Sequence, residues 1–319
     1  MRSRLYSLAA LTVAGLALVL TAGCGDDNNS GGSKNLSGSI KIDGSSTVGP
    51  LTEAAAELFR EENPDVKITV GISGTGGGFE KFCAKEIDIS DASRSIDAKE
   101  EVPVCKKAGV AYDEIQVAND GIAVVVNPDN DWAKCLTTAE LKKIWEKGSK
   151  VNNWNAVRSG FPDESMKLFG PGTDSGTFDF FTEAINGEKG NSRSDYSPSE
   201  DDNVTVQGVA GGKGNSGYFG LSYAEENKDK VKIAAVDDGD GCVTPSKETV
   251  QDGSYKPLSR PLFIYPSAAA LKRPEVDAFV KFYVDNYDQI ATQAKFVPMT
   301  TEQADKAKAT ADKVAGGTS

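Results

Sequence analysis

The chain of 319 residues contains no histidine. Serine–histidine and cysteine–histidine catalysis both need an imidazole as the base, and many metal sites use imidazole nitrogens as ligands. Without this side chain, the usual hydrolase triads and histidine-bound metal centres cannot form. This excludes those classes of enzyme and of metal site. We also expect that the protein is not an enzyme and that it uses no metal and no cofactor.

Positive charge is also in deficit, with 35 Lys and Arg residues against 47 Asp and Glu residues and a net charge of −12. A nucleic-acid-binding protein normally carries a basic patch, and no basic segment stands out in this sequence. We expect no nucleic-acid partner. The net negative charge of the chain repels anions. An anionic ligand would therefore have to be held by hydrogen-bond donors directed at it within the site.

A long apolar run occurs only at the start of the chain. Residues 5–20 are almost wholly apolar, follow two arginines and are short for a membrane span. Small residues then lead to Cys24, which predicts a lipoprotein signal peptide over residues 1–23 and lipid attachment, including palmitate, at Cys24. The alternative is an ordinary signal peptide followed by an incidental cysteine.

Residues 24–36 are polar and rich in glycine, serine, aspartate and asparagine. Residues 25–33 have no core-forming side chains, and the whole segment predicts a flexible tether. Together with Cys24, it predicts a protein that is anchored by lipid to the cell membrane and works on its extracytoplasmic face.

Four cysteines remain, at positions 83, 105, 135 and 242. An even number in an exported protein favours two disulfides, and four cysteines allow three pairings. We favour Cys83–Cys105 with Cys135–Cys242, because each bond then stays within one lobe of the fold expected below. Four buried free thiols are the alternative.

The pattern after the tether is that of an α/β sheet. Residues 39–43 alternate like a strand, a helix begins at Pro50, and residues 66–70 and 87–90 form further strands. This strand–helix–strand order is the unit of a parallel sheet. The inner face of the helix has helical spacing and consists of Leu51, Ala54, Ala55, Leu58 and Phe59.

Residues 122–127 predict a buried strand that enters a second lobe, and residues 261–265 return the chain to the first. Within the second lobe, Thr137 and Glu140 predict the capped start of a helix. The last segment, from residue 301, is rich in alanine, lysine and aspartate, and we expect a C-terminal tail or one frayed helix.

Four short polar segments lie near strand ends in this scheme, and three of them directly precede a helix. In open α/β sheets ligands bind at the carboxyl ends of the strands, and helix starts offer free N–H groups to anions. These segments therefore predict a site for a compact oxyanion. They are 44–47, 73–78, 91–94 and 173–177.

Asp91 is unexpected at an anion site, because a carboxylate repels a fully ionised ligand. It fits if the anion still carries a proton that the carboxylate can accept, as monohydrogen phosphate does and sulfate does not. An arginine partner or a turn at the strand end is the alternative role for Asp91.

Over residues 37–300 the chain resembles the PstS family, the phosphate-binding lipoproteins of the high-affinity phosphate ABC importer. The resembling stretches are Asp43–Pro50, Ser73–Phe79, Ser90–Arg94, Gly170–Phe181, Gly208–Gly211 and Gly217–Gly220. The resemblance implies a type II periplasmic-binding-protein fold with two lobes, each a mixed, mainly parallel sheet flanked by helices, joined by a two-stranded hinge. Lobe 1 would comprise residues 37–121 and 264–300, lobe 2 residues 122–263, and the tail residues 301–319.

The resemblance also implies a function: inorganic phosphate binds between the lobes and is delivered to the permease and ATPase subunits of the importer. We expect a monomeric receptor. Many family members carry an arginine where this chain has Pro171, and Arg94 is the expected substitute. The implied phosphate-binding residues are Ser46, Thr47, Val48, Thr75, Gly76, Asp91, Arg94, Ser175, Gly176 and Thr177.

Other functions fit the sequence less well. A receptor for sulfate or molybdate conflicts with Asp91, whereas arsenate is too similar to phosphate to exclude. A hydrolase with Ser46 or Ser175 as nucleophile would lack a base. A surface adhesin would fit the anchor but leave the four polar segments without a purpose.

Overall fold

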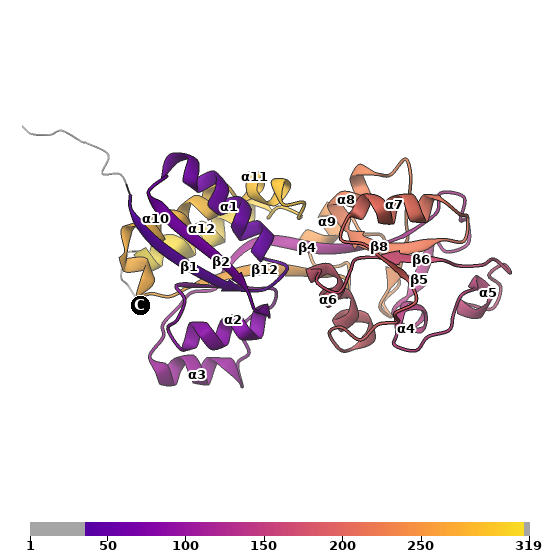
Figure 1. The fold of residues 1–319 in the computed structure, drawn as a ribbon, viewed down its shortest axis with the longest axis horizontal. Coiled ribbons are helices and arrows are strands. Elements are labelled where there is room, and N and C mark those ends of the chain that lie inside the picture. The colour runs from indigo at the N-terminus through magenta and orange to yellow at the C-terminus, as the bar shows by residue number, and fades with distance from the viewer. Residues whose placement is uncertain (1–35, 316–319) are drawn as a thin grey trace, which may run out of the picture. The chain divides into compact units, whose positions relative to one another are not determined.

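The computed structural model describes residues 36–315, and side chains up to residue 313. The expected signal peptide, Cys24 and the tether up to residue 35 lie outside the described residues. The described chain is an α/β structure with a nine-stranded mixed sheet, a smaller three-stranded sheet and helices against them (Figure 1).

The large sheet has the strand order β2-β1-β3-β12-β4-β8-β6-β7, with β9 paired to β4. The strands β1 to β3 are parallel, as the strand–helix–strand pattern predicted. The small sheet has the order β11-β10-β5. The strands are β1 Gly38–Gly44, β2 Val66–Ile72, β3 Ile89–Ala92, β4 Ile115–Val126, β5 Cys135–Thr137, β6 Leu168–Gly170, β7 Ser197–Pro198, β8 Ser216–Gly220, β9 Lys232–Ile233, β10 Ala235–Asp237, β11 Cys242–Val243 and β12 Ser259–Pro266.

The helices include the two that the sequence predicted most directly. α1 has Pro50 in its first turn and buries Leu51, Ala55 and Phe59, and α4 begins with the capping box of Thr137 and Glu140. The helices are α1 Gly49–Glu62, α2 Gly74–Cys83, α3 Glu101–Ala108, α4 Thr138–Trp145, α5 Trp154–Val157, α6 Gly176–Phe181, η1 Thr182–Asn186, α7 Asp202–Ala210, α8 Leu221–Glu226, α9 Lys247–Gln251, η2 Ala270–Lys272, α10 Pro274–Asp285, α11 Tyr287–Gln293 and α12 Thr301–Ala315.

Apolar side chains gather in three clusters. Two of these clusters are built from the two ends of the described chain, and we call the elements around them lobe 1. The third is built from the middle of the chain, and we call the elements around it lobe 2. β4 serves both lobes, because Ile115 and Val117 pack in lobe 1 whereas the run from Ile122 to Val126 packs in lobe 2. β12 pairs antiparallel with β4 along this passage, and Figure 1 shows the two strands side by side between the lobes.

Two segments differ from the sequence-based expectation. The glycine-rich segment after Ser73 is not a loop, because α2 already begins at Gly74. Gly78 explains why glycine is needed there, since an added Cβ would lie 2.6 Å from the Cα of Gly44.

The end of the chain is not a separate tail as far as Ala315. It forms α12, which packs against α10, and Ala304, Ala307 and Ala311 are buried in the core of lobe 1. The alanine spacing of three and four residues is a helical face, but alanine alone is a weak apolar signal.

The favoured disulfide pairing is confirmed. Cys83 on α2 is bonded to Cys105 on α3, and Cys135 on β5 to Cys242 on β11. Each bond joins two elements of the same lobe, so neither crosses between the lobes.

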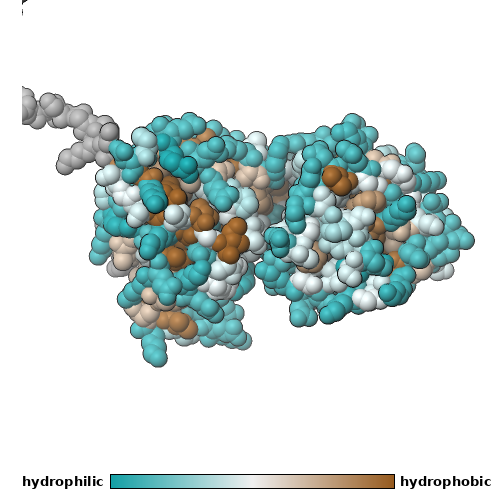
Figure 2. All heavy atoms as spheres, in the orientation of Figure 1, coloured by the Kyte–Doolittle hydropathy of each residue, from teal (hydrophilic) through white to brown (hydrophobic). Residues whose placement is uncertain are grey.

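The visible face of the described region is mostly hydrophilic, with apolar side chains in small separate groups (Figure 2). The exposed large apolar residues among those described are Ile72, Val104 and Val204. No helix between residues 36 and 315 is both long and apolar enough to cross a bilayer.

Candidate functional site

A cavity of about 500 Å³ is lined by residues of both lobes and of the connecting strand β12. The lobe 1 wall comes from the turn between β1 and α1 and from the start of α2, with Ser93 and Arg94 after β3. The lining residues are Ser45, Ser46, Thr47, Ser73, Gly74, Thr75, Gly76, Ser93, Arg94, Asp179, Phe180, Glu183, Ala184, Lys189 and Arg260. Of the ten residues expected from the sequence, five are present: Ser46, Thr47, Thr75, Gly76 and Arg94.

The turn from β1 into α1 is held by Ser45. Its Oγ accepts the backbone N–H groups of Thr47 and Val48, at 3.2 and 3.4 Å. The Ser46 hydroxyl donates to Asp179 of lobe 2 at 3.3 Å. Val48 is fully buried and does not line the cavity, because its side chain packs in the lobe 1 core.

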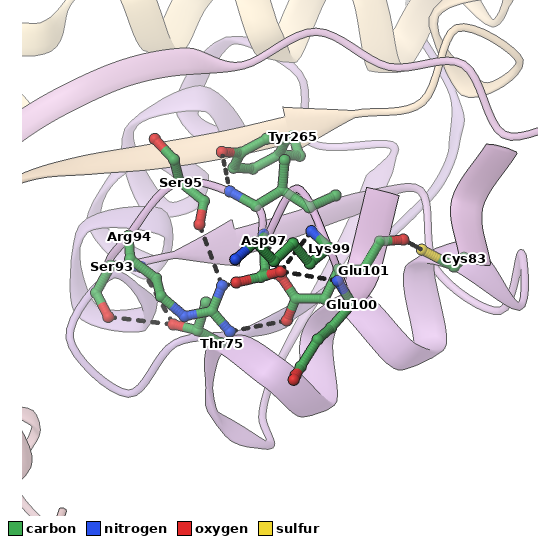
Figure 3. A network of polar contacts seen from close by, with 11 residues as sticks. Thr75, Cys83, Ser93, Arg94, Ser95, Asp97, Lys99, Glu100, Glu101 and Tyr265 are labelled. Atoms are coloured by element: carbon green, nitrogen blue, oxygen red, sulfur yellow. Dashed lines mark hydrogen bonds and ion pairs between the residues drawn. The ribbon is translucent and has the colours of Figure 1, made fainter. Parts of the chain in front are cut away.

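The start of α2 forms the neighbouring part of the wall. The Thr75 hydroxyl lies 3.1 Å from the Ser93 hydroxyl and accepts the Ser93 backbone N–H at 3.2 Å, so α2 is fixed to the segment after β3 (Figure 3). An added Cβ on Gly76 would meet nothing within 4 Å. This end of α2 is therefore open toward the cavity.

Arg94 lines the cavity, but its guanidinium is already paired. Nη1 and Nη2 donate to the two carboxylate oxygens of Glu101 at 2.8 and 2.7 Å, and Nη1 also donates to the Ser95 carbonyl (Figure 3). These hydrogen bonds to Glu101 raise the pKa of Arg94. The expected substitute for the family arginine thus has its charge balanced within lobe 1.

Asp91 does not line the cavity. Its backbone carbonyl accepts the Ser45 N–H at 3.0 Å, but both carboxyl oxygens are buried without a hydrogen-bond partner. The nearby Thr52 hydroxyl is bonded to the Tyr283 hydroxyl at 3.3 Å instead. Burial raises the pKa of Asp91 to about 8, and the charge of Asp43 adds to the increase.

The lobe 2 side begins with Ser175, which caps α6 by accepting the Thr177 N–H at 3.1 Å. Neither residue lines the cavity, and nor does Gly176. Gly176 instead packs against Thr47 of lobe 1, so closely that an added Cβ would lie 2.6 Å from the Thr47 hydroxyl and 2.8 Å from its backbone nitrogen. Asp179 pairs with Lys189 at 2.7 Å beside the cavity.

Sequence reasoning missed Arg260, the cation that β12 places in the cavity. Its Nε donates to Asp120 at 3.2 Å, its Nη2 donates to the Thr47 hydroxyl at 2.8 Å, and its guanidinium lies 3.7 Å from the Phe180 ring centre. Burial lowers the pKa of Arg260, but an arginine side chain in a protein stays protonated at neutral pH. The available signal was a charged residue at the edge of the apolar strand 261–265.

The cavity thus presents hydroxyl groups and cationic side chains, together with the carboxylates of Asp179 and Glu183. Among residues 36–313, no group of three histidine, cysteine, aspartate or glutamate side chains is placed to hold a metal ion.

Residues 29–286 match the model of a protein family described as the PBP superfamily domain. The chain belongs to the PBP superfamily.

Curated relatives narrow the family. The chain is 41% identical over 307 residues to the phosphate-binding protein PstS of Staphylococcus saprophyticus, covering 94% of this chain and 93% of the relative. It is 49% identical over 263 residues to protein SphX of Synechococcus elongatus, covering 82% of this chain and 77% of the relative. It belongs to the family of these PstS proteins, which are binding proteins, and this confirms that it is not an enzyme.

Solved structures of this superfamily have the same fold. A possible phosphate-binding protein from Planctomyces limnophilus matches with a TM-score of 0.84 and 49% identity, over 88% of this chain and 99% of that one. An ABC-type phosphate transport receptor from Vibrio cholerae matches in fold at 20% identity, with a TM-score of 0.62 over 82% of this chain and 100% of that one.

The buried carboxyl of Asp91 predicts a pH-dependent stability. The folded chain holds a proton on Asp91 that the unfolded chain releases above a pKa of about 3.8, so this contribution is full below that pH and is lost as pH rises to about 8. The loss is at most about 1.4 kcal/mol per pH unit. We expect Asp91→Asn to be increasingly more stable than wild type from pH 4 to pH 8, in urea unfolding at fixed temperature.

Asp229→Asn, at an exposed position, is the control and should follow the wild-type curve. Parallel curves for wild type and Asp91→Asn would show that the buried carboxyl does not hold its proton in the folded chain.

Proposed function

We propose that this protein is an extracytoplasmic receptor that binds inorganic phosphate between its two lobes and delivers it to an ABC importer. The observation that supports this most is the donor-lined cavity shared by both lobes, in a chain whose relatives are named phosphate-binding proteins. A chain with a net charge of −12 has to hold an anion by local donors, and this cavity supplies them.

The lobe 1 wall is the proposed docking surface for the anion. The hydroxyls of Thr47 and Thr75 and the backbone N–H of Gly76 at the start of α2 would donate to phosphate oxygens. The Ser46 hydroxyl and the Val48 N–H at the start of α1 would join them by exchanging their present acceptors, Asp179 and the Ser45 hydroxyl, for the anion. Both helices have at least ten residues and direct the positive ends of their dipoles to this side. Arg94, which lines the cavity with its charge balanced by Glu101, would make a secondary contact with the anion.

The lobe 2 residues Ser175, Gly176 and Thr177 complete the site when the lobes close. β4 and β12 act as the hinge, because they are the strands that run between the two lobes. The proposed lobes are residues 37–121 with 264–300, to which α12 is added, and residues 122–263. Closure excludes water and strengthens each hydrogen bond to the anion.

Asp91 is the proposed proton acceptor. In the present structure burial keeps this carboxyl protonated, so it would have to ionise as phosphate binds. The carboxylate would then receive the hydrogen bond of monohydrogen phosphate and repel fully ionised sulfate. Since the carboxyl is buried near Thr52 and Tyr283 and does not line the cavity, this role requires the wall to rearrange when phosphate binds.

Cys24 is the proposed lipid attachment site. The proposed tether is residues 24–35, one residue shorter than expected from the sequence, because Leu36 packs against the core of lobe 1. Two acyl chains of a diacylglycerol suffice for stable anchoring, with palmitate as a further acyl group. The protein would be a monomer at the outer face of the cell membrane, where its closed form meets the permease subunits while the ATPase subunits act on the other side.

The direct test is calorimetric titration of the anion-free protein, lacking its lipid, with phosphate and then with sulfate at pH 8. We expect phosphate to bind with a dissociation constant in the micromolar range or lower and sulfate to give no heat. In Asp91→Asn, the rejection of sulfate should weaken more than the binding of phosphate does, so that sulfate binding becomes measurable. Asp229→Asn is the matched control.

Equal binding of both anions by the wild type would contradict a phosphate receptor. An unchanged phosphate-to-sulfate ratio in Asp91→Asn would limit Asp91 to a structural role.

Gly176→Ala tests the closed contact between the lobes. The new Cβ would collide with backbone and hydroxyl atoms of Thr47, and overpacking of this kind costs about 1–3 kcal/mol, so phosphate affinity should fall by roughly 10-fold. Gly220→Ala has open space around its Cβ and should bind as wild type does. Titration measures both, and equal affinities would show that the lobes need not meet at this point.

A further inference from the structure

Among the described residues, three cationic side chains line the cavity, and they differ in how their charge is used. Arg94 is doubly bonded to Glu101 and its side chain is 46% exposed, whereas Lys189 is paired with Asp179 and is 55% exposed. Charges this exposed are well screened by solvent and contribute little to holding an ion.

Arg260 is the buried cation, with a side chain only 14% exposed. Its guanidinium has five N–H donors. The Nε–H is directed to Asp120 and Nη2 to the Thr47 hydroxyl, while Nη1 has no hydrogen-bond partner among residues 36–313. Donors therefore remain for a ligand in the cavity that Arg260 lines.

The position of this guanidinium is fixed from two sides. Arg260 and Asp120 face each other in the β12–β4 register, so the ion pair is carried by adjacent strands. The Phe180 ring lies 3.7 Å from the guanidinium carbon and supports it by a cation–π contact. An arginine held this way loses little freedom when an anion binds.

The bond to Thr47 also orients the hydroxyl. Because Thr47 Oγ1 accepts a hydrogen from Nη2, its own hydrogen is free to be donated elsewhere, and the cavity is beside it. Arg260 and Thr47 thus form one donor unit, contributed by the connecting strand and by lobe 1.

We propose that Arg260 supplies the main positive charge for the anion, replacing the family arginine that Pro171 removes, and that it does so together with Thr47. This inference rests on the proposed phosphate-receptor function and names the residue on which affinity depends. Since Arg260 contacts Thr47 of lobe 1 and Phe180 of lobe 2, an anion bound to it also joins the two lobes.

The test is titration of Arg260→Gln with inorganic phosphate, beside the wild type. Loss of charged hydrogen bonds to the anion should weaken binding by roughly 10- to 100-fold. Arg260→Lys, which keeps the charge and loses the fork, should give an intermediate affinity. Arg158→Gln is the matched control, because Arg158 also pairs with a carboxylate, Glu140, and lies over a ring, Phe161, but outside the cavity.

Asp120 would be left buried and unpaired in Arg260→Gln, which could unfold the chain. The double variant Asp120→Asn/Arg260→Gln removes both charges and separates stability from binding: we expect a folded protein with the same loss of phosphate affinity. Wild-type affinity in the single and double variants would overturn this inference alone. A wild-type chain that does not bind phosphate would overturn the proposed function and this inference with it.

Discussion

The structure depends on the antiparallel pairing of β4 with β12. β4 is buried along almost all of its length, and its first residues pack in lobe 1 while its last residues pack in lobe 2. β12 brings the chain back along the same path. The two lobes are therefore joined by a pair of hydrogen-bonded strands, and Arg260 on β12 lines the cavity that both lobes share.

The same two strands also carry a buried ion pair that provides positive charge for an anion in an acidic chain. An acidic chain must concentrate donors where the anion sits, and helix starts and hydroxyls do this without adding net charge. The Arg260–Asp120 pair places a buried positive group at the junction while the pair itself stays neutral. In a poorly hydrated position such a group acts more strongly on an anion than the exposed Arg94 or Lys189 can.

Local features were predictable from the sequence because neighbours along the chain determine them. The apolar face of α1, the capping box of α4 and the parallel first strands follow from spacing over a few residues. The disulfide pairing followed once the lobes were assigned, since each bond joins elements of one lobe.

The rest depended on tertiary contacts. Arg260 meets Thr47 across 213 positions, and no local pattern marks such a pair. The burial of the Asp91 carboxyl depends on which face of β3 the side chain occupies. The guanidinium of Arg94 is paired with Glu101, a residue on the following helix. α12 packs through alanines, whose contribution appears only when a partner helix is present.

A crystal structure of the protein grown with phosphate would test the central claim most directly. The account predicts one phosphate in the cavity between the lobes, within hydrogen-bond distance of the Thr47 hydroxyl and the Arg260 guanidinium, with β4 and β12 still paired. A phosphate bound elsewhere, or one held by Arg94 while Arg260 is bonded only to Asp120 and Thr47, would contradict it.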